Sequence, residues 1–308
     1  MTDAHCHVSC GDPAVRELLV GRNFFGVHPW ETLGETTGTC ETGEACETGA
    51  GHSSLACPAS HQLIASLRAA LLANPAAGVG EIGLDRLKCR DISPRMREVF
   101  ETQLALAVEL RRPVVLHGAK CWGQVVEACK VAVQKWHLRQ SEVDCRLSED
   151  AMSNCPPSLL FHGFSRSDGL IPDIVKLNGY ISVGPAVLND HAVNYRELVK
   201  KIPLDRLLVE TDRTDLVGTS ALARPQLVGT SAPARPQLVG TSAPARPQLV
   251  GTSAPARPQL VGTSALARPP APTIYDILAK VAELRGVSAA ELEKITDENA
   301  ERFMGASL

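Results

Sequence analysis

Histidine and carboxylate side chains follow most of the short apolar segments of this sequence. They are His5 and His7 at the first segment, Glu81 and Asp85 at the third, His117 at the fourth, His162 at the fifth and Asp212 at the last. Imidazole nitrogens and carboxylate oxygens are ligands of zinc, manganese and related divalent cations. Side chains two positions apart lie on the same face of an extended chain, so His5 and His7 point the same way. The pattern predicts a centre for one or two metal ions.

The apolar segments alternate with patterns typical of helices. Strands are predicted at 2–5, 24–28, 78–82, 113–117, 158–162, 180–183 and 206–210. The clearest helix begins after the N-cap residue Ser93, has Pro94 at its first position and ends before Pro113. Further helices are predicted at 61–73, 122–136, 190–201, 274–285 and 288–303. This alternation predicts an α/β protein with a parallel sheet, either doubly wound or closed into a (β/α) barrel.

The positions of the polar residues favour the barrel. In a barrel the carboxyl ends of all strands meet at one mouth, whereas an open sheet brings together only the ends near its switch point. Each residue alone has a simpler interpretation: His117 as a hydrogen-bonded structural histidine, Glu210 as a surface carboxylate beside Asp212. Their occurrence together at five strand ends is the observation that predicts a metal centre.

Composition excludes several classes of protein. The 308 residues are 44% hydrophobic and 21% charged, as in a globular protein, and the net charge of −3 excludes a generic polybasic nucleic-acid binder. No apolar run approaches the roughly 18 residues of a membrane span, so no membrane association is expected. The ten cysteines form no CxxC pair and no signal-peptide core is present. We expect reduced thiols and a cytoplasmic protein, with the nucleus as the other open compartment.

Two low-complexity insertions interrupt what we expect to be one domain, 1–308. The sequence LVGTSALARPQ begins at Leu216 and recurs with a period of 11 residues through 216–270. Its Gly and Pro residues disfavour a helix, and it lacks the aromatic residues that a packed repeat would bury, so a flexible tandem repeat is predicted. Alternatively, the repeat is a ligand for protein domains that bind PxxP motifs or basic segments. The Thr, Gly and Glu-rich segment 31–57 is predicted to be a surface loop.

Eight motifs identify a resemblance to a known family. In chain order they are DAHCH, FFGVHPW, VGEIGLD, FETQLALAVELRRPVVLH, LLFHGFS, YISVG, RLLVETD and ITDENAERFMG. This order resembles the TatD family of metal-dependent deoxyribonucleases, which have a TIM-type (β/α) barrel. The match covers most of the chain outside 31–57, 138–157 and 216–270.

The resemblance implies a centre of one or two divalent ions in which Glu81 is a bridging ligand. The implied ligands are His5, His7, Glu81 and Asp212 for one ion and Glu81, His117 and His162 for the other. His28 matches a family position close to the site and is interpreted as a substrate-binding residue. Imidazole and carboxylate together suit zinc or manganese, whereas magnesium prefers more oxygen ligands, and the sequence does not choose among the three.

The implied function is metal-dependent hydrolysis of DNA phosphodiester bonds at strand ends, with DNA as the partner and no protein partner indicated. Asp212 is the candidate general base and Glu81 the second catalytic residue, although a pure ligand role for Asp212 stays open. Hydrolysis of a small ester, lactone or amide uses the same metal chemistry and also stays open. So does a degenerate, non-catalytic family member.

The chain also departs from the family pattern. His28 follows His7 by only 21 positions, too few for the βα unit expected between the HxH and GxHP motifs, and we count seven strands. The barrel is therefore predicted to lack one βα unit near its N-terminus. The ETD motif continues with Arg213, Thr214 and Asp215, where the family has a small residue, Pro and an aromatic residue.

Overall fold

The computed structural model describes residues 1–33, 58–88, 90–142, 155–213 and 271–305. Its strands are β1 Thr2–Cys6, β2 Arg16–Leu19, β3 Phe24–Phe25, β4 Gly78–Asp85, β5 Val114–Ala119, β6 Leu159–Phe161, β7 Gly179–Val183 and β8 Leu207–Val209. Its α-helices are α1 Pro58–Ala73, α2 Pro94–Leu110, α3 Trp122–Glu142, α4 Ile171–Lys176, α5 Val193–Lys201, α6 Ile274–Arg285 and α7 Ala289–Met304. The 3-10 helices are η1 Pro29–Leu33, η3 Asp168–Leu170, η4 Pro185–Leu188 and η5 Leu204–Arg206. All of these elements belong to one compact unit.

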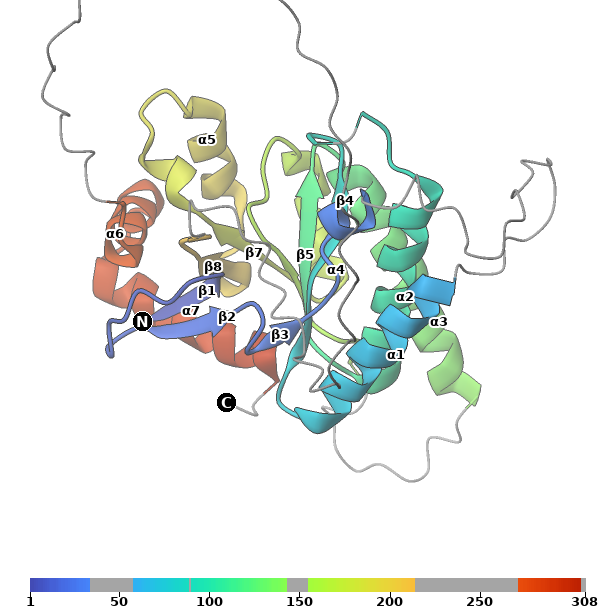
Figure 1. Cartoon of the computed structure of the whole chain (residues 1–308). Helices are drawn as coiled ribbons and strands as arrows, with labels where there is room; N and C mark the ends of the chain where they lie inside the picture. The colour runs from blue at the N-terminus through green and yellow to red at the C-terminus, as the bar shows by residue number, and fades with distance from the viewer. Residues whose placement is uncertain (34–57, 89, 143–154, 214–270, 306–308) are drawn as a thin grey trace, which may run out of the picture. The chain divides into compact units, whose positions relative to one another are not determined.

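The described strands pair in parallel and follow the order of the chain. Strands β3 to β8 form one sheet, and β1 pairs with β2 (Figure 1). The two sheets meet at both edges. Val20 bridges to Phe24 at the start of β3, and beyond β8 the backbone N–H of Asp212 donates to the carbonyl of His5 at 3.1 Å. This arrangement confirms the predicted α/β barrel fold.

The strand count of seven was wrong, because β2 supplies an eighth strand. We missed it because its sequence, RELL, has two polar residues and only Leu18 is buried. Among the described residues, the segments 7–15 and 20–23 that flank β2 contain no helix. The short interval between His7 and His28 therefore contains strand β2 but no outer helix.

Most helices begin and end near the predicted residues. Helix α2 begins as expected, with the Ser93 side chain accepting from the N–H of Met96, and ends at Arg111 in the left-handed conformation. Helix α6 ends at Gly286, whose φ of 67° favours glycine. Helix α4 was not predicted because it has only six residues. Both predicted insertions lie outside the described residues, except for 31–33, which belong to η1.

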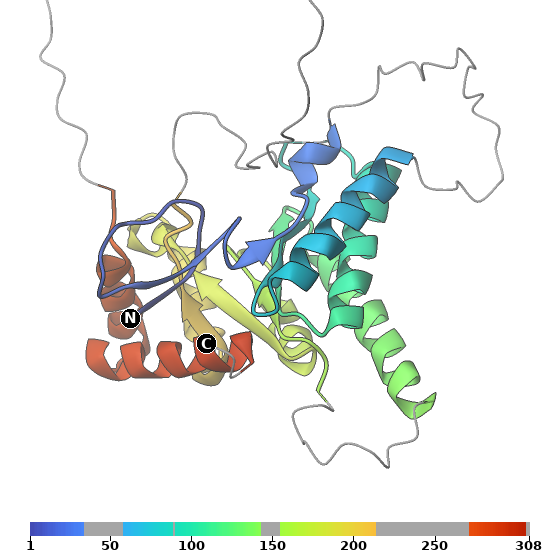
Figure 2. The ribbon, with the colours of Figure 1, turned by 60° about the horizontal axis from the view of Figure 1, so that its bottom comes forward.

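Alternate residues of the strands face two apolar clusters. On β5, Val114 and Leu116 pack outward against the helices, and Val115 packs inward with the Phe24 and Phe303 side chains. Helix α7 contributes Phe303 and lies against β1 and β8, and Figure 2 shows it crossing beneath the strands. No described helix is long and apolar enough to cross a bilayer. The inward positions beyond the inner cluster, such as His117, are polar.

Candidate metal centre

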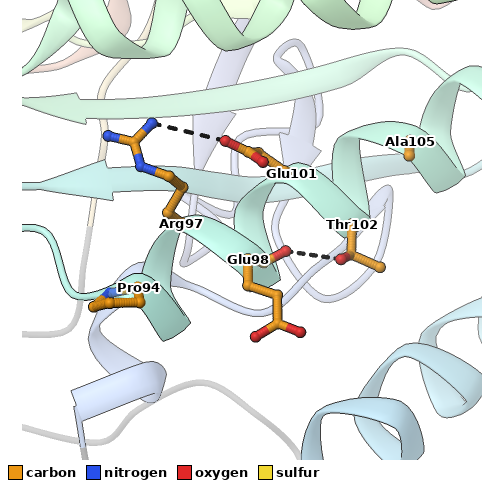
Figure 3. Close-up of a pocket in the computed structure, with 6 residues that line it drawn as sticks. All are labelled: Pro94, Arg97, Glu98, Glu101, Thr102 and Ala105. Atoms are coloured by element: carbon orange, nitrogen blue, oxygen red, sulfur yellow. Dashed lines mark hydrogen bonds and ion pairs between the residues drawn. The ribbon is translucent and has the colours of Figure 1, made fainter. Parts of the chain in front are cut away.

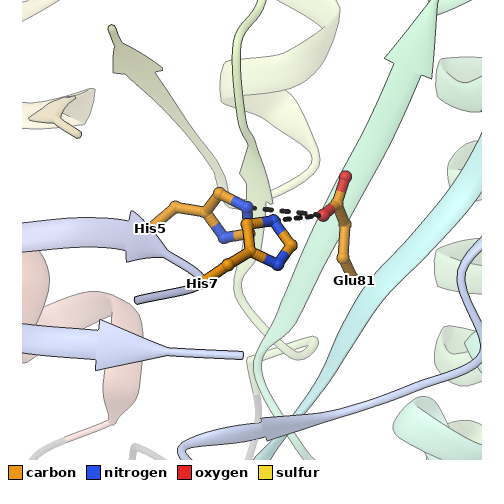
Figure 4. A group of neighbouring side chains, drawn as sticks. All are labelled: His5, His7 and Glu81. Atoms are coloured by element: carbon orange, nitrogen blue, oxygen red, sulfur yellow. Dashed lines mark ion pairs between the residues drawn. The ribbon is translucent and has the colours of Figure 1, made fainter. Parts of the chain in front are cut away.

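Strand β1 and the residues beyond it present the first two histidines. His5 is completely buried, and the His7 side chain is 20% exposed. Their backbone is held by the segment after β8: Asp212 donates to the His5 carbonyl at 3.1 Å, and His7 donates to the Arg213 carbonyl at 2.9 Å. Both rings point toward Glu81 (Figure 4). The predicted HxH pair therefore lies on one face, next to a carboxylate from a distant strand.

The carboxylate of Glu81 lies at the centre of the cluster, and its two oxygens face different histidines. Oε2 lies 3.4 Å from Nε2 of His5 and 3.3 Å from Nε2 of His7. Oε1 lies 2.5 Å from Nδ1 of His117 and 2.7 Å from Nε2 of His162. Glu81 is therefore placed between two groups of imidazoles.

An irregularity in β4 turns Glu81 inward. The pairing of β4 with β5 shifts register between Val79 and Ile82, and both of these residues pack in the outer cluster. Between these two pairings β4 has one more residue than β5, and an extra residue changes the side to which the next side chain points. Gly83 then lets the strands approach, because a Cβ there would lie 2.0 Å from the His117 carbonyl oxygen.

The remaining predicted residues join the same cluster. Nε2 of His28, after β3, lies 3.4 Å from Oε1 of Glu81. Oδ1 of Asp212 lies 3.7 Å from Nε2 of His5 and equally far from Nε2 of His7, and its side chain is 43% exposed. All seven residues of the predicted site are thus brought together by the fold.

Three overlapping groups of these side chains have ligand atoms close enough to hold a metal ion. They are His5, His7 and Glu81; His5, His162 and Asp212; and His28, Glu81 and His117. In each group the ligand atoms lie within 4.8 Å of one another. The ring nitrogens Nδ1 and Nε2 of buried His5 and Nδ1 of His162 have no hydrogen-bond partner. Because such buried polar atoms are costly, and nitrogen with carboxylate oxygen suits zinc or manganese, the residues fit a divalent cation.

The electrostatics of the cluster are those of a buried anion surrounded by imidazoles. Burial alone would raise the pKa of Glu81, yet the charge of His162 and hydrogen bonds from His117 and His162 hold it well below its usual range. Burial opposes protonation of His162, but Glu81, Glu210 and Asp212 raise its pKa to about 10. Burial, followed by the charge of His162, lowers the pKa of His5. The buried carboxylate is thus stabilised by positive charge, which a proton or a metal ion supplies.

Two further carboxylates, Asp85 and Asp3, support the cluster. Asp85, 1% exposed, accepts from the backbone N–H groups of Leu87 and Lys88 at 2.6 and 2.9 Å and lies 3.3 Å from Nε2 of His117. Asp3 accepts from the N–H and the hydroxyl of Thr211 at 3.0 and 2.6 Å. Asp85 and Asp3 therefore hold the strand ends that carry the histidines.

The interpretation of Glu210 as a surface carboxylate was wrong. Glu210 is completely buried and accepts from the Ser182 hydroxyl at 2.5 Å and from the Gly163 N–H at 2.7 Å. Burial raises its pKa to about 7. Its sequence position, one residue after a buried strand, resembles that of an exposed rim residue. Only the neighbouring strands β6 and β7 reveal that Glu210 is enclosed.

A surface hollow lies away from the cluster. It has a volume of about 420 Å³ and runs along the exposed side of α2 (Figure 3). Within it Arg97 pairs with Glu101 at 3.7 Å, and the Thr102 hydroxyl donates to the Glu98 carbonyl at 2.8 Å. Its lining has no histidine and its charged side chains pair with one another or face solvent, whereas the histidine cluster has converging ligand atoms, so the cluster is the candidate functional site.

The fold and the cluster together define an α/β barrel with a histidine and carboxylate centre. The chain belongs to the family of TatD-related DNases, whose pattern matches residues 20–305. This confirms the resemblance drawn from the motifs. The crystal structure of YJJV, a TatD homologue from Escherichia coli, superposes with a TM-score of 0.53 at 19% identity, covering 95% of this chain and 78% of that one. A TatD family hydrolase from Entamoeba histolytica gives a TM-score of 0.51 at 14% identity, with coverage of 94% and 75%. At these identities the likeness supports the fold.

Sequence relatives match smaller parts of the chain. The uncharacterized metal-dependent hydrolase YabD of Bacillus subtilis is 31% identical over 134 residues, 44% of this chain and 45% of that protein. The human 3'-5' RNA nuclease TATDN2 is 35% identical over 142 residues, 44% of this chain and 16% of that protein. The 3'-5' ssDNA/RNA exonuclease TatD of Klebsiella pneumoniae is 27% identical over 148 residues, 48% and 49% of the two chains. The chain thus matches about half or less of the length of these relatives.

Proposed function

We propose that this protein is a metal-dependent nuclease that removes nucleotides from the ends of DNA strands. The observation that carries the proposal is the placement of Glu81, with one oxygen facing His5 and His7 and the other facing His117 and His162. The family match and the nuclease names of two relatives support phosphodiesters as the substrate.

The ligand assignment follows the two sides of Glu81. His5, His7, Glu81 and Asp212 would hold one ion, and Glu81, His117 and His162 a second. The chemistry that these residues would gain from a bound divalent cation is polarisation of a phosphoryl oxygen and a lowered pKa of water. Magnesium, manganese and zinc are the candidates, and the imidazole-rich set favours the last two.

Asp212 is the proposed general base. Its side chain is 43% exposed while its neighbours His5 and Glu81 are buried, so it can contact both the centre and incoming water. Its backbone lies in the left-handed region with φ of 46°, which a non-glycine residue adopts at a cost. Glu81 is enclosed by imidazoles, so its catalytic role is to hold the centre together.

His28 is the proposed substrate contact. Its Nδ1 accepts a hydrogen bond from the N–H of Trp30 at 3.2 Å, and burial lowers its pKa. A neutral His28 therefore carries its proton on Nε2, the atom that faces Glu81 at 3.4 Å. The proposed contact therefore requires an oxygen of the bound phosphodiester to replace Glu81 as the acceptor of this N–H group.

The proposal is tested by assaying nucleotide release from single-stranded DNA and RNA with magnesium, manganese or zinc, alongside generic ester, lactone and amide substrates. Release from strand ends supports the nuclease. Hydrolysis of the small substrates alone would replace it with a small-molecule hydrolase, and no activity with any metal would indicate a degenerate member. We also propose a cytoplasmic or nuclear location, because the five described cysteines are all free thiols.

A further inference from the structure

We propose that Trp30 and Lys88 form a nucleotide-binding subsite beside the metal centre, in which a base stacks on the indole and the ammonium group binds the adjoining phosphate. The inference rests on the proposed nuclease function, and it specifies a single-stranded nucleic acid end as the substrate. Trp30 belongs to the 3-10 helix η1 that follows β3, and Lys88 lies in the loop after β4.

Trp30 is exposed at a position where its ring is nevertheless fixed. Its exposed fraction is 42%, whereas Trp122 and Trp136 are 5% and 3% exposed. The indole N–H donates to Oδ2 of the buried Asp85 at 2.5 Å. A large aromatic surface left in water costs free energy, and here it is held rigidly. Such a preorganised ring is suited to binding a planar ligand.

The indole lies next to the candidate metal ligands. Its ring centroid is 4.4 Å from that of His28 and 6.1 Å from that of His117. Asp85 contacts both Trp30 and His117, since its Oδ2 accepts from the indole and lies 3.3 Å from Nε2 of His117. A base on Trp30 would therefore belong to a nucleotide at or next to the cleaved phosphodiester.

Lys88 supplies a cation at the same place. Its Nζ lies 2.9 Å from the centroid of the Trp30 ring, and its backbone N–H donates to Oδ1 of Asp85 at 2.9 Å. Within the part of the chain that the structure describes, no carboxylate forms an ion pair with Lys88, which is exposed. The ammonium group rests instead on the face of the indole, a cation–π contact.

The two side chains can exchange partners when a strand binds. The lysine stem is flexible, so a phosphate can attract the ammonium group away from the ring. The ring face that Lys88 leaves is then open to a base. Because stacking on an aromatic side chain tolerates every base, this subsite would accept strand ends of any sequence.

Binding is tested on the full chain with chelator present, using a dye-labelled single-stranded oligonucleotide and its counterpart with an abasic terminal nucleotide. Trp30→Leu should weaken binding of the normal oligonucleotide by about 5- to 100-fold, the range for loss of one stacked base. Trp30→Phe loses the bond to Asp85 but keeps a ring, so it should retain most of the affinity. Tyr275→Leu, which alters another exposed aromatic residue at 43%, is the control and should bind normally.

The abasic oligonucleotide separates stacking from general damage. Replacing the terminal base should weaken binding to the unaltered protein about as much as Trp30→Leu does, and it should have little further effect in Trp30→Leu. Equal affinity of Trp30→Leu and the unaltered protein for the normal oligonucleotide would overturn the subsite. So would equal losses in Trp30→Phe and Trp30→Leu, because the bond to Asp85 would then explain both.

Lys88 is tested through the salt dependence of binding. Lys88→Gln should reduce the slope of log affinity against log salt by about 0.7, the value for one phosphate contact on a single strand. The control Lys135→Gln changes an exposed lysine on α3 and should leave the slope unchanged. An unchanged slope in Lys88→Gln would remove the phosphate contact from the proposal.

The subsite and the nuclease function fail separately in these experiments. Cleavage of DNA by the unaltered protein together with unchanged binding by Trp30→Leu overturns the subsite and leaves the nuclease standing. Trp30-dependent binding without cleavage under any metal supports the subsite and overturns the nuclease. If the unaltered protein neither binds nor cleaves single strands, both are wrong.

Discussion

Two parts of the barrel bring histidines to the same carboxylate in different ways. Strands β4 and β5, which carry Glu81 and His117, are backed by α2 and α3, helices of 17 and 21 residues. Strands β1 and β2 are joined by the loop 7–15, and no helix lies within that described segment. His5 and His7 nevertheless reach Glu81 as closely as 3.4 and 3.3 Å.

The difference shows what can replace an outer helix. On the side of the barrel covered by α2 and α3, here called the backed side, apolar packing positions the strands. The Trp122 ring of α3, for example, lies 5.8 Å, centroid to centroid, from the Phe161 ring of β6. On the side formed by β1 and β2, here called the bare side because the described loop 7–15 between them contains no helix, hydrogen bonds link β1 to its neighbours. They join Asp3 to Thr211 at 2.6 Å and Thr2 to Arg16 at 2.9 Å. The N-terminal ammonium adds an ion pair to Asp297 of α7 at 3.1 Å. These polar bonds thus add to the inner packing of β1, whose Ala4 lies in the cluster of Phe24 and Phe303, whereas β5 is packed by apolar residues on its outer side as well.

The largest effect is expected where the two parts meet, at Glu81. In Glu81→Gln the neutral amide no longer offsets the surrounding imidazoles and binds metal poorly. We expect loss of metal from both groups and a fall in cleavage beyond the roughly 10²–10⁴-fold of a lost general base. Metal analysis and nuclease assay of the purified variant measure both. Normal metal content with normal activity would show that Glu81 does not join the two parts.

The next largest effect is expected for Asp212→Asn, which keeps the size of the side chain and one potential ligand oxygen. If Asp212 accepts the proton, the rate should fall by about 10²–10⁴-fold while the metal content stays near normal. If it is only a ligand, metal content and rate fall together and added metal restores much of the rate. Unchanged cleavage would contradict both roles.

On the backed side, stability should depend on packing. Leu104 of α2 is 2% exposed, and Leu104→Ala should lower the free energy of unfolding by about 2–5 kcal/mol through the cavity it leaves. The matched control Leu72→Ala changes a leucine that is 58% exposed and should cost little. Denaturant unfolding of both variants compares them. Equal costs would show that α2 is not packed as described.

On the bare side, stability should depend on polar bonds, with a smaller effect per site. Asp3→Ala leaves the N–H and hydroxyl of Thr211 without their acceptor, which should cost about 1–3 kcal/mol of unfolding free energy. Thr211→Val loses one of the two bonds and should cost less. Thermal unfolding measures both, and no loss in Asp3→Ala would mean that the bond does not hold β1.

Local patterns predicted those parts of the molecule that depend on neighbours along the chain. The α2 helix follows from the Ser93 cap, Pro94 and apolar spacing, and the capping residue accepts from Met96 as expected. Six of the seven candidate site residues were selected because they follow apolar strands, and His28 was added from the family resemblance; the fold brings all seven together. Strand β2 escaped because its four residues have no apolar run to mark it.

Other features could not be read from local pattern. Alternation along β4 does not predict the direction of Glu81, because the register shift that turns it inward depends on pairing with β5. Glu210 looks like a rim residue until β6 and β7 enclose it. The contacts of Trp30 with Asp85 and Lys88 join η1 to the end of β4 and the loop after it, and Trp30 and Asp85 are 55 positions apart in the chain.

The sequence by itself determined the family, the types of the metal-competent residues and the helices whose caps and periodicity are local. Only the tertiary structure decided that β2 completes the set of eight described strands, that Glu81 faces histidines on both sides, and that Asp3 and Glu210 are buried anchors. The physical reason is that capping and periodicity act between residues a few positions apart. Strand register, burial of a polar group and the meeting of loops depend on contacts between residues far apart in the chain.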